Sequence, residues 1–439
     1  MAHARTDRWG CPVHAARQEA VDLLDEATEQ LVSLSGEPTM LAEQAASCDP
    51  ELVLARVLQA YLALYAGSVA ELERATALVG TLVPSSIGTG ERERLHLLAA
   101  QSWAGGEWEG ATGFLEQALL QDPRDLLALK VAQDLHFLLG NQNGLRDVVE
   151  RVVAAWPSDR PGYGYVCGMH AFGLEENGDY DGAEEQARRA LRANPGDVWA
   201  VHAQAHVFEM RGAQRPGIAF LERTAVDWSS SYFATHNWWH RALYHLDLGE
   251  LDEALALFDG PIRGTRSDAW LDVDDAASLL WRLHLYGVDV DDRARTLLGD
   301  MGELSDASVS VFNDWHALMV AGLAERADLT DRLILANRRA CQGSNRRAVE
   351  AAGLQLLEAF AAFAGDEARG ALDGLVEIRS LAGVVGGSHA QRDVIDLTLM
   401  AAAARVGDLP LAQALLAERV QRKPSSEAAG LAVIRTNSD

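Results

Sequence analysis

The sequence predicts an all-α protein of tetratricopeptide-like helical hairpins that form one continuous, strongly curled superhelix. Strand-like alternation is nearly absent, apolar residues recur at helical spacing, and three segments share one pattern. The segments are GEWEGATGFLEQALLQDP (106–123), GDYDGAEEQARRALRANP (178–195) and GDLPLAQALLAERVQRKP (407–424). Each begins with a helix-breaking Gly, has a small residue five positions later and closes with Pro seventeen positions later. This is the second half of a repeat of about 34 residues.

The position of these glycines gives the elements in order. Counting back fourteen residues from each turn glycine puts repeat starts near Arg92, Leu126, Gly164, Val198, Thr235 and Asp393. Helical periodicity also predicts two pairs within 15–80 and degenerate pairs at 278–300, 309–340 and 350–386. We therefore expect a single repeat domain over 1–439, divided into N-terminal capping pairs (15–91), recognisable repeats (92–260), degenerate pairs (261–390), a C-terminal repeat (391–425) and a tail (426–439).

Composition excludes several classes of partner. The formal net charge of −26 leaves no basic surface for a phosphate backbone, so we expect neither nucleic acid nor membrane as a partner. The four cysteines lie far apart and form no CxxC pair, and no segment is apolar enough for a signal peptide or a membrane span. These features predict a cytoplasmic protein. Its only two lysines are Lys130 and Lys423.

The stretch DVWAVHAQAHVFEMRG (197–212) carries an unusual polar stripe. In a tetratricopeptide repeat, the second, fifth, ninth and twelfth residues of the first helix line the concave surface. In this copy they are Trp199, His202, His206 and Glu209. The equivalent positions of the other copies are His96, Lys130, Asp134, Tyr165, Phe172, Glu175, His236 and Trp239, with His240 one turn beyond His236.

Two interpretations of this groove stay open. If the groove is wide and filled with water, ionisable residues in it cost no desolvation energy, and their presence is no evidence of a binding site. However, His, Trp, Tyr and Phe are typical of ligand pockets, whereas solvated helix faces in this chain carry Arg, Glu, Asp and Ala.

A more specific form of the pocket hypothesis is that the pocket binds a metal ion. A metal at His202, His206, Glu209, His236 and His240 fits their helical spacing. We do not favour it, and we expect no cofactor, because HxxxH without an adjacent catalytic Glu is common in helices. Proton transfer by a His paired with a carboxylate needs no metal.

The chain also contains, in order, LALKVAQDLHFLLG, YGYVCGMHAFGLEENGDYDGAEEQARRAL, DVWAVHAQAHVFEM, HNWWHRALYHLDLGELDEALALFD, LDVDDAASLLWRL, FNDWHALM and GGSHAQRDV. Together these segments resemble the tetratricopeptide repeat protein 38 family over almost the whole chain. The resemblance implies a helical superhelix and no particular activity. It maps the family's motif residues onto Asp134, Glu175, His206, Glu209, His236, His240, Asp272, Asp275, His316, Gln391, Arg392 and Asp393.

Three of these motifs lie outside the clean repeats. We expect Asp272 and Asp275 to stand at a helix entrance, where they cap free N–H groups. The two glycines of GGSHAQRDV predict a tight turn or an anion-binding nest, and Arg392 either holds an anion or pairs internally with Asp393 or another acid. His316 fits a core position and a pocket position equally well.

The leading functional hypothesis is a concave pocket for a small molecule, with acid–base catalysis as one form of it. The catalytic candidates are His206, Glu209, His240 and Glu175. The substrate-binding candidates are Lys130, Asp134, Tyr165, Phe172, Trp199, His202, His236, Trp239 and Arg392. The alternative is an adaptor that binds a peptide or protein partner in its groove. For groove residues, we expect His206→Ala or Glu209→Gln to leave folding nearly intact, within about 0.5 kcal/mol.

Overall fold

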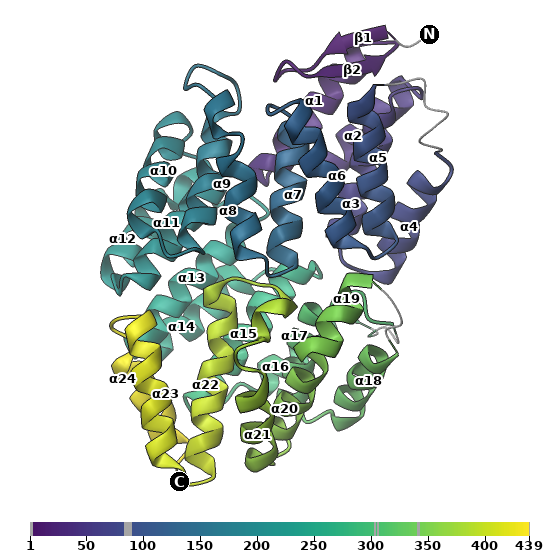
Figure 1. Ribbon diagram of the computed structural model, residues 1–439. Coiled ribbons are helices and arrows are strands. Elements are labelled where there is room, and N and C mark those ends of the chain that lie inside the picture. Colours follow the sequence, from purple (N-terminus) through teal and green to yellow (C-terminus); the bar gives the residue numbers. More distant parts are fainter. Residues whose placement is uncertain (1–2, 83–89, 303, 305–306, 340–342, 439) are drawn as a thin grey trace. The chain divides into compact units, whose positions relative to one another are not determined.

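The computed structural model describes residues 3–82, 90–302, 304, 307–339 and 343–438 (Figure 1). Its helices pack into two compact units, and each is described by itself. Unit 1 comprises residues 1–204 and 227–233, and unit 2 comprises residues 205–226 and 234–439. Two of the divisions fall inside helices, in α11 (Val198–Met210) and in α12 (Gln214–Trp228).

Unit 1 begins with a short antiparallel hairpin and continues with paired helices. Its elements are β1 (His3–Thr6), β2 (Pro12–Ala15), α1 (Gln18–Ser33), α2 (Pro38–Cys48), α3 (Val53–Tyr65), α4 (Val69–Gly80), α5 (Glu91–Ala104), α6 (Trp108–Gln121), α7 (Leu126–Leu138), α8 (Gln142–Glu150), the 3₁₀ turn η1 (Val153–Ala155), α9 (Tyr163–Glu175) and α10 (Tyr180–Ala193). Successive helices pack as hairpins, for example α5 with α6 and α9 with α10.

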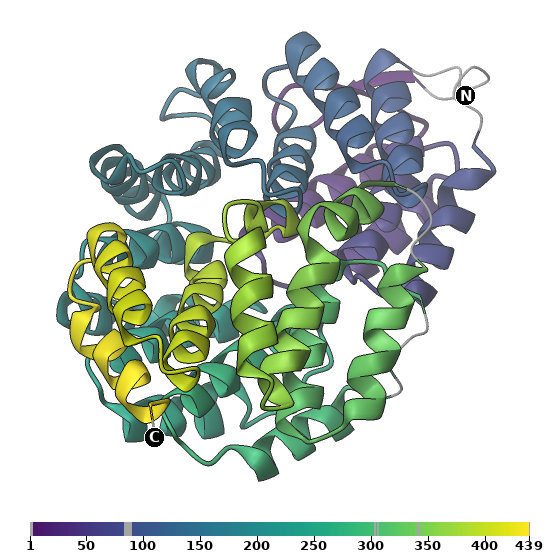
Figure 2. The same cartoon turned by 60° about the horizontal axis from the view of Figure 1, so that its bottom comes forward.

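Unit 2 continues the same architecture. Its elements after α12 are α13 (Ala234–Asp247), α14 (Leu251–Leu257), the π-helical turn η2 (Phe258–Ile262), α15 (Trp270–Leu285), α16 (Asp291–Asp300), α17 (Val311–Leu323), α18 (Ala327–Arg338), α19 (Gly343–Ala348), the π-helical turn η3 (Val349–Gly353), α20 (Leu354–Ala364), α21 (Ala368–Ile378), the 3₁₀ turn η4 (Ala382–Val385), α22 (His389–Arg405), α23 (Leu409–Arg422) and α24 (Glu427–Thr436). The first helices α13, α15, α17 and α20 pack on one another in sequence, each with its own second helix. Figure 2 shows α22, α23 and α24, in yellow, side by side.

The helical-repeat fold class is confirmed, and the predicted phase is accurate. The first helices of the predicted copies begin at Glu91, Leu126, Tyr163, Val198 and Ala234, each within one residue of its expected start. Only the last differs, because α22 begins four residues earlier than predicted, at His389. The turn glycines explain this accuracy: Gly106 and Gly178 have φ of 83° and 81°, a left-handed conformation that ends a helix and suits Gly.

Two features of the termini add to the prediction. The segment predicted as a tail contains α24, which packs on α22 and α23. At the other end, β1 pairs with β2 in a hairpin that the sequence pattern did not indicate, because each strand has only four residues. The hairpin is tied to α5 by an ion pair of 2.8 Å from Arg92 Nη1 to Asp7 Oδ2.

Each unit has its own apolar core. In unit 1 the ring of Tyr61 lies 6.1 Å from that of Trp103, and in unit 2 the ring of Phe360 packs between Trp281 and Trp315 at 5.1 and 5.2 Å. Cys11, Cys48 and Cys167 are free thiols, whereas Cys341 lies outside the described residues. Among the described helices, none combines the length and apolar character that crossing a membrane requires.

Candidate functional site

The residues predicted for the site are distributed over both units. Lys130, Asp134, Tyr165, Phe172, Glu175, Trp199 and His202 belong to unit 1, whereas His206, Glu209, His236, Trp239, His240 and Arg392 belong to unit 2. The two groups are therefore described separately.

In unit 1, an aromatic box surrounds His202. The rings of Trp199, Phe172 and Phe233 lie 4.9, 5.0 and 5.2 Å from the imidazole, respectively. Lys130 Nζ lies 4.7 Å from the centre of the Trp199 ring, at the distance of a cation–π contact. The structure thus brings together four of the predicted residues, Lys130, Phe172, Trp199 and His202. They form a mainly apolar cluster with one cation at its edge.

The cation of this cluster is neutralised locally. Lys130 Nζ lies 2.8 Å from Asp134 Oδ1, one helical turn further along α7, and Tyr65 donates its hydroxyl to Asp134 Oδ2 at 2.6 Å. Tyr165 is partly buried, and burial raises the pKa of its phenol. Glu175, near the end of α9, is fully buried.

In unit 2, three imidazoles meet. His206 comes from α11, whereas His236 and His240 are one turn apart on α13. One ring nitrogen of each lies within 4.8 Å of the others, and the ring centres of His206 and His240 are 4.4 Å apart. All three residues are buried. We call them the three-histidine cluster.

Carboxylates contact two rings of the three-histidine cluster at the same nitrogen. Asp275, on α15, places both carboxylate oxygens 2.9 Å from His236 Nδ1, and Glu209 Oε2 lies 3.1 Å from His240 Nδ1. This contact fixes the ring orientation, because the opposite nitrogen then faces away from the acid. Burial, followed by the neighbouring imidazoles and the more distant Lys423 and Arg282, holds the pKa of His240 well below its usual range, so the ring is neutral at neutral pH.

Trp239 forms one wall of this region. Its ring stacks on His236 with the centres 5.2 Å apart and the planes 17° apart. The guanidinium carbon of Arg282 lies 5.4 Å from the centre of the same indole. Arg282 is itself buried, and burial lowers its pKa below the ordinary value for arginine.

Behind Glu209 lies a network of buried charges that the sequence analysis missed. Lys423 Nζ lies 2.8 Å from Glu209 Oε1 and 2.8 Å from Asp247 Oδ2. Burial favours the neutral amine, yet the carboxylates of Asp247 and Glu209 raise the pKa of Lys423 above its usual value. Arg419 holds Asp393 through two contacts of 2.8 and 2.7 Å, and against the opposing effect of burial it keeps the pKa of that carboxyl well below its usual range.

This burial speaks against the alternative of a wide, wet groove at Glu209 and His206. Each exposes only 1% of its surface. Their replacement therefore perturbs a packed interior, and the premise behind the expected cost of within about 0.5 kcal/mol, that both are groove residues with little packing, does not hold. The one signal available in the sequence was the rarity of lysine, since Lys423 is one of only two.

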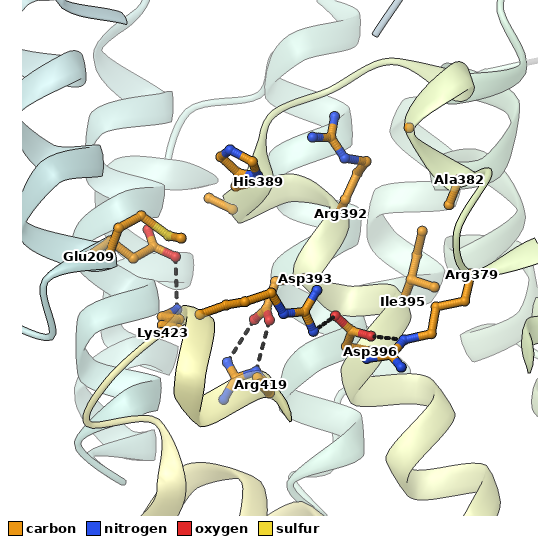
Figure 3. A pocket seen from close by; sticks show the side chains of 14 residues that line it. Glu209, Arg379, Ala382, His389, Arg392, Asp393, Ile395, Asp396, Arg419 and Lys423 are labelled. Atoms are coloured by element: carbon orange, nitrogen blue, oxygen red, sulfur yellow. Dashed lines mark hydrogen bonds and ion pairs between the residues drawn. The ribbon is translucent and has the colours of Figure 1, made fainter. Parts of the chain in front are cut away.

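A cavity of about 150 Å³ opens beside this network in unit 2 (Figure 3). It is formed mainly by α22, α23 and the η4 turn. Its charged lining residues are Glu209, Arg379, Arg392, Asp393, Asp396, Arg419, Arg422 and Lys423, and His389 lines it as well. In Figure 3, Glu209 points toward Lys423 and Asp393 toward Arg419. Of the residues predicted for the site, Glu209 and Arg392 line this cavity.

The motifs outside the clean repeats take other roles than expected. Ala269 is the N-cap of α15, and neither Asp272 nor Asp275 caps that helix, because Asp272 lies in its first turn and Asp275 faces His236. Asp393 pairs with Arg419 rather than with its neighbour Arg392.

The structure also describes the glycine turn and the surroundings of His316. Gly386 and Gly387 form a tight turn with φ of 92° and 80°, and Arg392 donates to both of their carbonyl oxygens. Ser388 and Gln391 then close a capping box at the start of α22. His316 is a core histidine: it is fully buried against Phe312 O, and burial lowers its pKa to about 3.

Comparison with known proteins gives only distant likenesses. No family model matches the sequence. Among solved structures, the APC/C hetero-tetramer Cut9–Hcn1 is similar with a TM-score of 0.44 and 14% identity, over 94% of this chain and 69% of that one. Yeast Tom70 follows with a TM-score of 0.34 and 11% identity over 95% of each chain. The TPR domain of P58(IPK) has a TM-score of 0.21 and 14% identity, over 92% of this chain and 99% of that domain.

The class of protein is therefore defined by its own helices. The chain is an all-α helical-repeat protein of tetratricopeptide type, with successive hairpins that start where the repeat phase requires. Likenesses at this level of identity carry no statement about partner or activity.

Proposed function

We propose that this protein is a helical-repeat adaptor that binds a protein partner, and that the cavity of unit 2 receives a carboxylate side chain of that partner. The observation that carries the proposal is the concentration of cationic side chains on the lining of the cavity. Five of them line it against three carboxylates, in a chain whose net charge is −26, while Asp247 and Glu418 contact three of these cations from outside the lining. A lining that carries more cations than carboxylates favours an anionic group as the occupant.

Of the two arginines at the rim, Arg422 has donors to spare. Asp396 accepts from Arg379 Nε at 2.9 Å and from Arg422 Nη2 at 2.7 Å, and Arg379 Nη1 also donates to Glu418 Oε2 at 2.5 Å. Each guanidinium carries five N–H donors in a fork that matches a carboxylate. A partner's carboxylate can therefore bind Arg422 without displacing Asp396.

The size of the cavity and its surroundings favour a side chain over a free metabolite. The cavity holds about 150 Å³, whereas small-molecule pockets commonly have about 300–1,000 Å³. Two exposed apolar side chains, Leu381 and Val384, stand beside the lining residues Ala382 and Gly383. An acidic residue flanked by apolar ones would match this combination of an anion site and an apolar edge.

Acid–base catalysis on a small molecule is a second candidate, favoured by one contact. Glu209 on His240 Nδ1 is the arrangement of a base oriented by a carboxylate. We prefer the adaptor because His206, Glu209 and His240 expose 1% or less of their surface, and because Glu209 is shared with Lys423.

The test uses the full chain and an array of synthetic peptides of about twelve residues. Each peptide carries one Asp or Glu flanked by apolar residues, and is paired with a copy in which that acid is Asn or Gln. We expect selective capture of acidic peptides. We also expect Arg422→Gln to weaken it about tenfold or more, since a hydrogen bond to a charged group contributes about 1.5–3 kcal/mol.

The matched control is Arg369→Gln, because Arg369 is also an exposed arginine of unit 2 that pairs with an aspartate, and it does not line the cavity. Equal capture of acidic and amide peptides, or equal loss in both variants, would overturn the proposal. Free succinate, titrated against a bound peptide, distinguishes the alternative: displacement at a similar concentration would indicate a small-molecule site instead.

We also infer that the chain is a member of the tetratricopeptide repeat protein 38 family and acts in the cytoplasm. The ordered motifs of the sequence support the first inference. The scattered cysteines, three of which are free thiols, support the second.

A further inference from the structure

We propose that the three-histidine cluster, His206, His236 and His240, is a binding site for a divalent transition-metal ion, with Zn²⁺ as the preferred ion. The proposal goes beyond the adaptor function and does not depend on it. The two sites share one residue, Glu209, which lines the cavity and contacts His240.

The geometry of the cluster suits a metal ion. One ring nitrogen of each histidine lies within 4.8 Å of the other two. Three nitrogen ligands of a tetrahedral Zn²⁺ lie roughly 3.3 Å apart, given Zn–N distances of about 2.0–2.1 Å. A rotation that moves each ring nitrogen by about an ångström is therefore enough to close the site. Two helices contribute, α11 with one ligand and α13 with two that are one turn apart.

Two carboxylates supply the outer contacts that metal-binding histidines usually have. Asp275 accepts from His236 Nδ1 at 2.9 Å, and Glu209 lies 3.1 Å from His240 Nδ1. Such contacts fix the tautomer in which Nε2 carries the lone pair, and they make the ring a stronger ligand. Two of the three rings thus carry the carboxylate contact that carboxylate–histidine–zinc sites have.

The charges around the cluster are compatible with a bound cation. Two cations act on the cluster: Lys423, which is paired with Glu209 and Asp247, and Arg282, whose guanidinium donates to the carbonyl oxygens of Ser278 and Ala390. Glu209 and Asp275 bring negative charge directly onto the rings. Histidine nitrogens with no thiolate select borderline ions such as Zn²⁺ over Mg²⁺ or Ca²⁺. Three protein ligands also leave the fourth position of a tetrahedral ion open.

The sequence alone did not favour this site, because a pair of histidines at i and i+4 is common in helices. What the structure adds is the third ring from another helix and the carboxylate on Nδ1 of two rings. Neither feature follows from the spacing along one helix.

The experiment measures metal binding by the full chain after treatment with a chelator. Titration with Co²⁺ should give a visible absorption band typical of tetrahedral coordination, saturating at one ion per chain, and Zn²⁺ should displace it. His240→Gln and His206→Gln should bind at least about a hundredfold more weakly. Asp275→Asn, which keeps all three ligands, should bind about 10–100-fold more weakly.

His316→Gln is the matched control, because His316 is equally buried in unit 2 and lies outside the cluster. It should bind Co²⁺ as the parent does. If circular dichroism shows that a ligand variant does not fold, the proposal is judged from two other results. These are the number of ions bound per parent chain and the affinity of Asp275→Asn. The proposal is overturned if the folded parent binds no ion, or if Asp275→Asn and the folded ligand variants bind as tightly as the parent.

Discussion

Replacing Lys423 with methionine tests whether the buried charge network holds unit 2 together. Lys423 is buried, with its ammonium 2.8 Å from Glu209 Oε1 and 2.8 Å from Asp247 Oδ2. Methionine keeps most of the aliphatic stem and removes the charge. Lys423→Met therefore leaves two buried carboxylates that have lost their shared cation.

The expected loss is large because the pair is desolvated. Removing one partner of a buried ion pair costs about 3–5 kcal/mol, since the remaining charge stays in a medium that solvates it poorly. Asp247 retains a hydrogen bond of 3.3 Å from the neutral amide of Gln214 and the longer contact of 3.6 Å to Arg419. A unit of about this size loses about 2–4 °C of melting temperature per kcal/mol, so a loss of about 4 kcal/mol lowers the transition of unit 2 by roughly 12 °C.

Far-UV circular dichroism during thermal and urea unfolding measures this loss. Arg422→Met is the control, because Arg422 is the preceding residue and half exposed, and it should change the stability by no more than about 0.5 kcal/mol. The double variant Glu209→Gln/Lys423→Met should lose less than the sum of the single variants, by about 1–3 kcal/mol. A Lys423→Met protein that unfolds within about 0.5 kcal/mol of the parent would refute the reasoning.

Two further predictions concern unit 1. Burial raises the pKa of Asp197 to about 6, so its contribution to stability is present below about pH 4 and is lost as the pH rises through 6. Asp197→Asn should therefore be more stable than the parent at about pH 8, by about 2–3 kcal/mol in urea unfolding, and show no gain near pH 4; a gain of equal size at both pH values would contradict this. A Cβ at Gly173 would meet Arg146 Cα at 2.8 Å and Leu145 O at 2.9 Å, both backbone atoms that cannot yield easily. Gly173→Ala should destabilise unit 1 by about 1–3 kcal/mol, whereas Gly113→Ala, which meets nothing within 4 Å on α6, should be neutral or stabilising by up to about 1 kcal/mol; equal effects of the two variants would count against the packing argument.

The fold could be predicted from the sequence because its signals are local. Gly178 ends α9 in a left-handed conformation, and Pro195 follows α10, so the boundaries of this hairpin are encoded within eighteen residues. The concave-face rule also brought His206, His236 and His240 to attention, since it follows from helical periodicity. Within one helix, the number of residues between two positions determines how far apart they lie and whether they share a face.

The partners of these residues could not be predicted in the same way. Lys423 lies 214 positions from Glu209 along the chain, and no periodicity links them. Asp275 stands at a place where helix capping is the ordinary role of an aspartate, and only the packing of α15 on α13 turns it toward His236. The burial of these residues could not be predicted for the same reason. Whether a polar stripe faces solvent or a neighbouring helix depends on contacts between helices, which the sequence of one helix does not encode.

The rarity of lysine gives each unit a chemical reporter of its own. Lys130 lies in unit 1 and Lys423 in unit 2, and they expose 3% and 5% of their surface. An amine-acylating reagent can modify either side chain only when the surrounding helices open, because each ammonium is held in an ion pair. Peptide mapping by mass spectrometry after timed acylation would then give the opening rates of the two units separately, in one intact chain and without an introduced label.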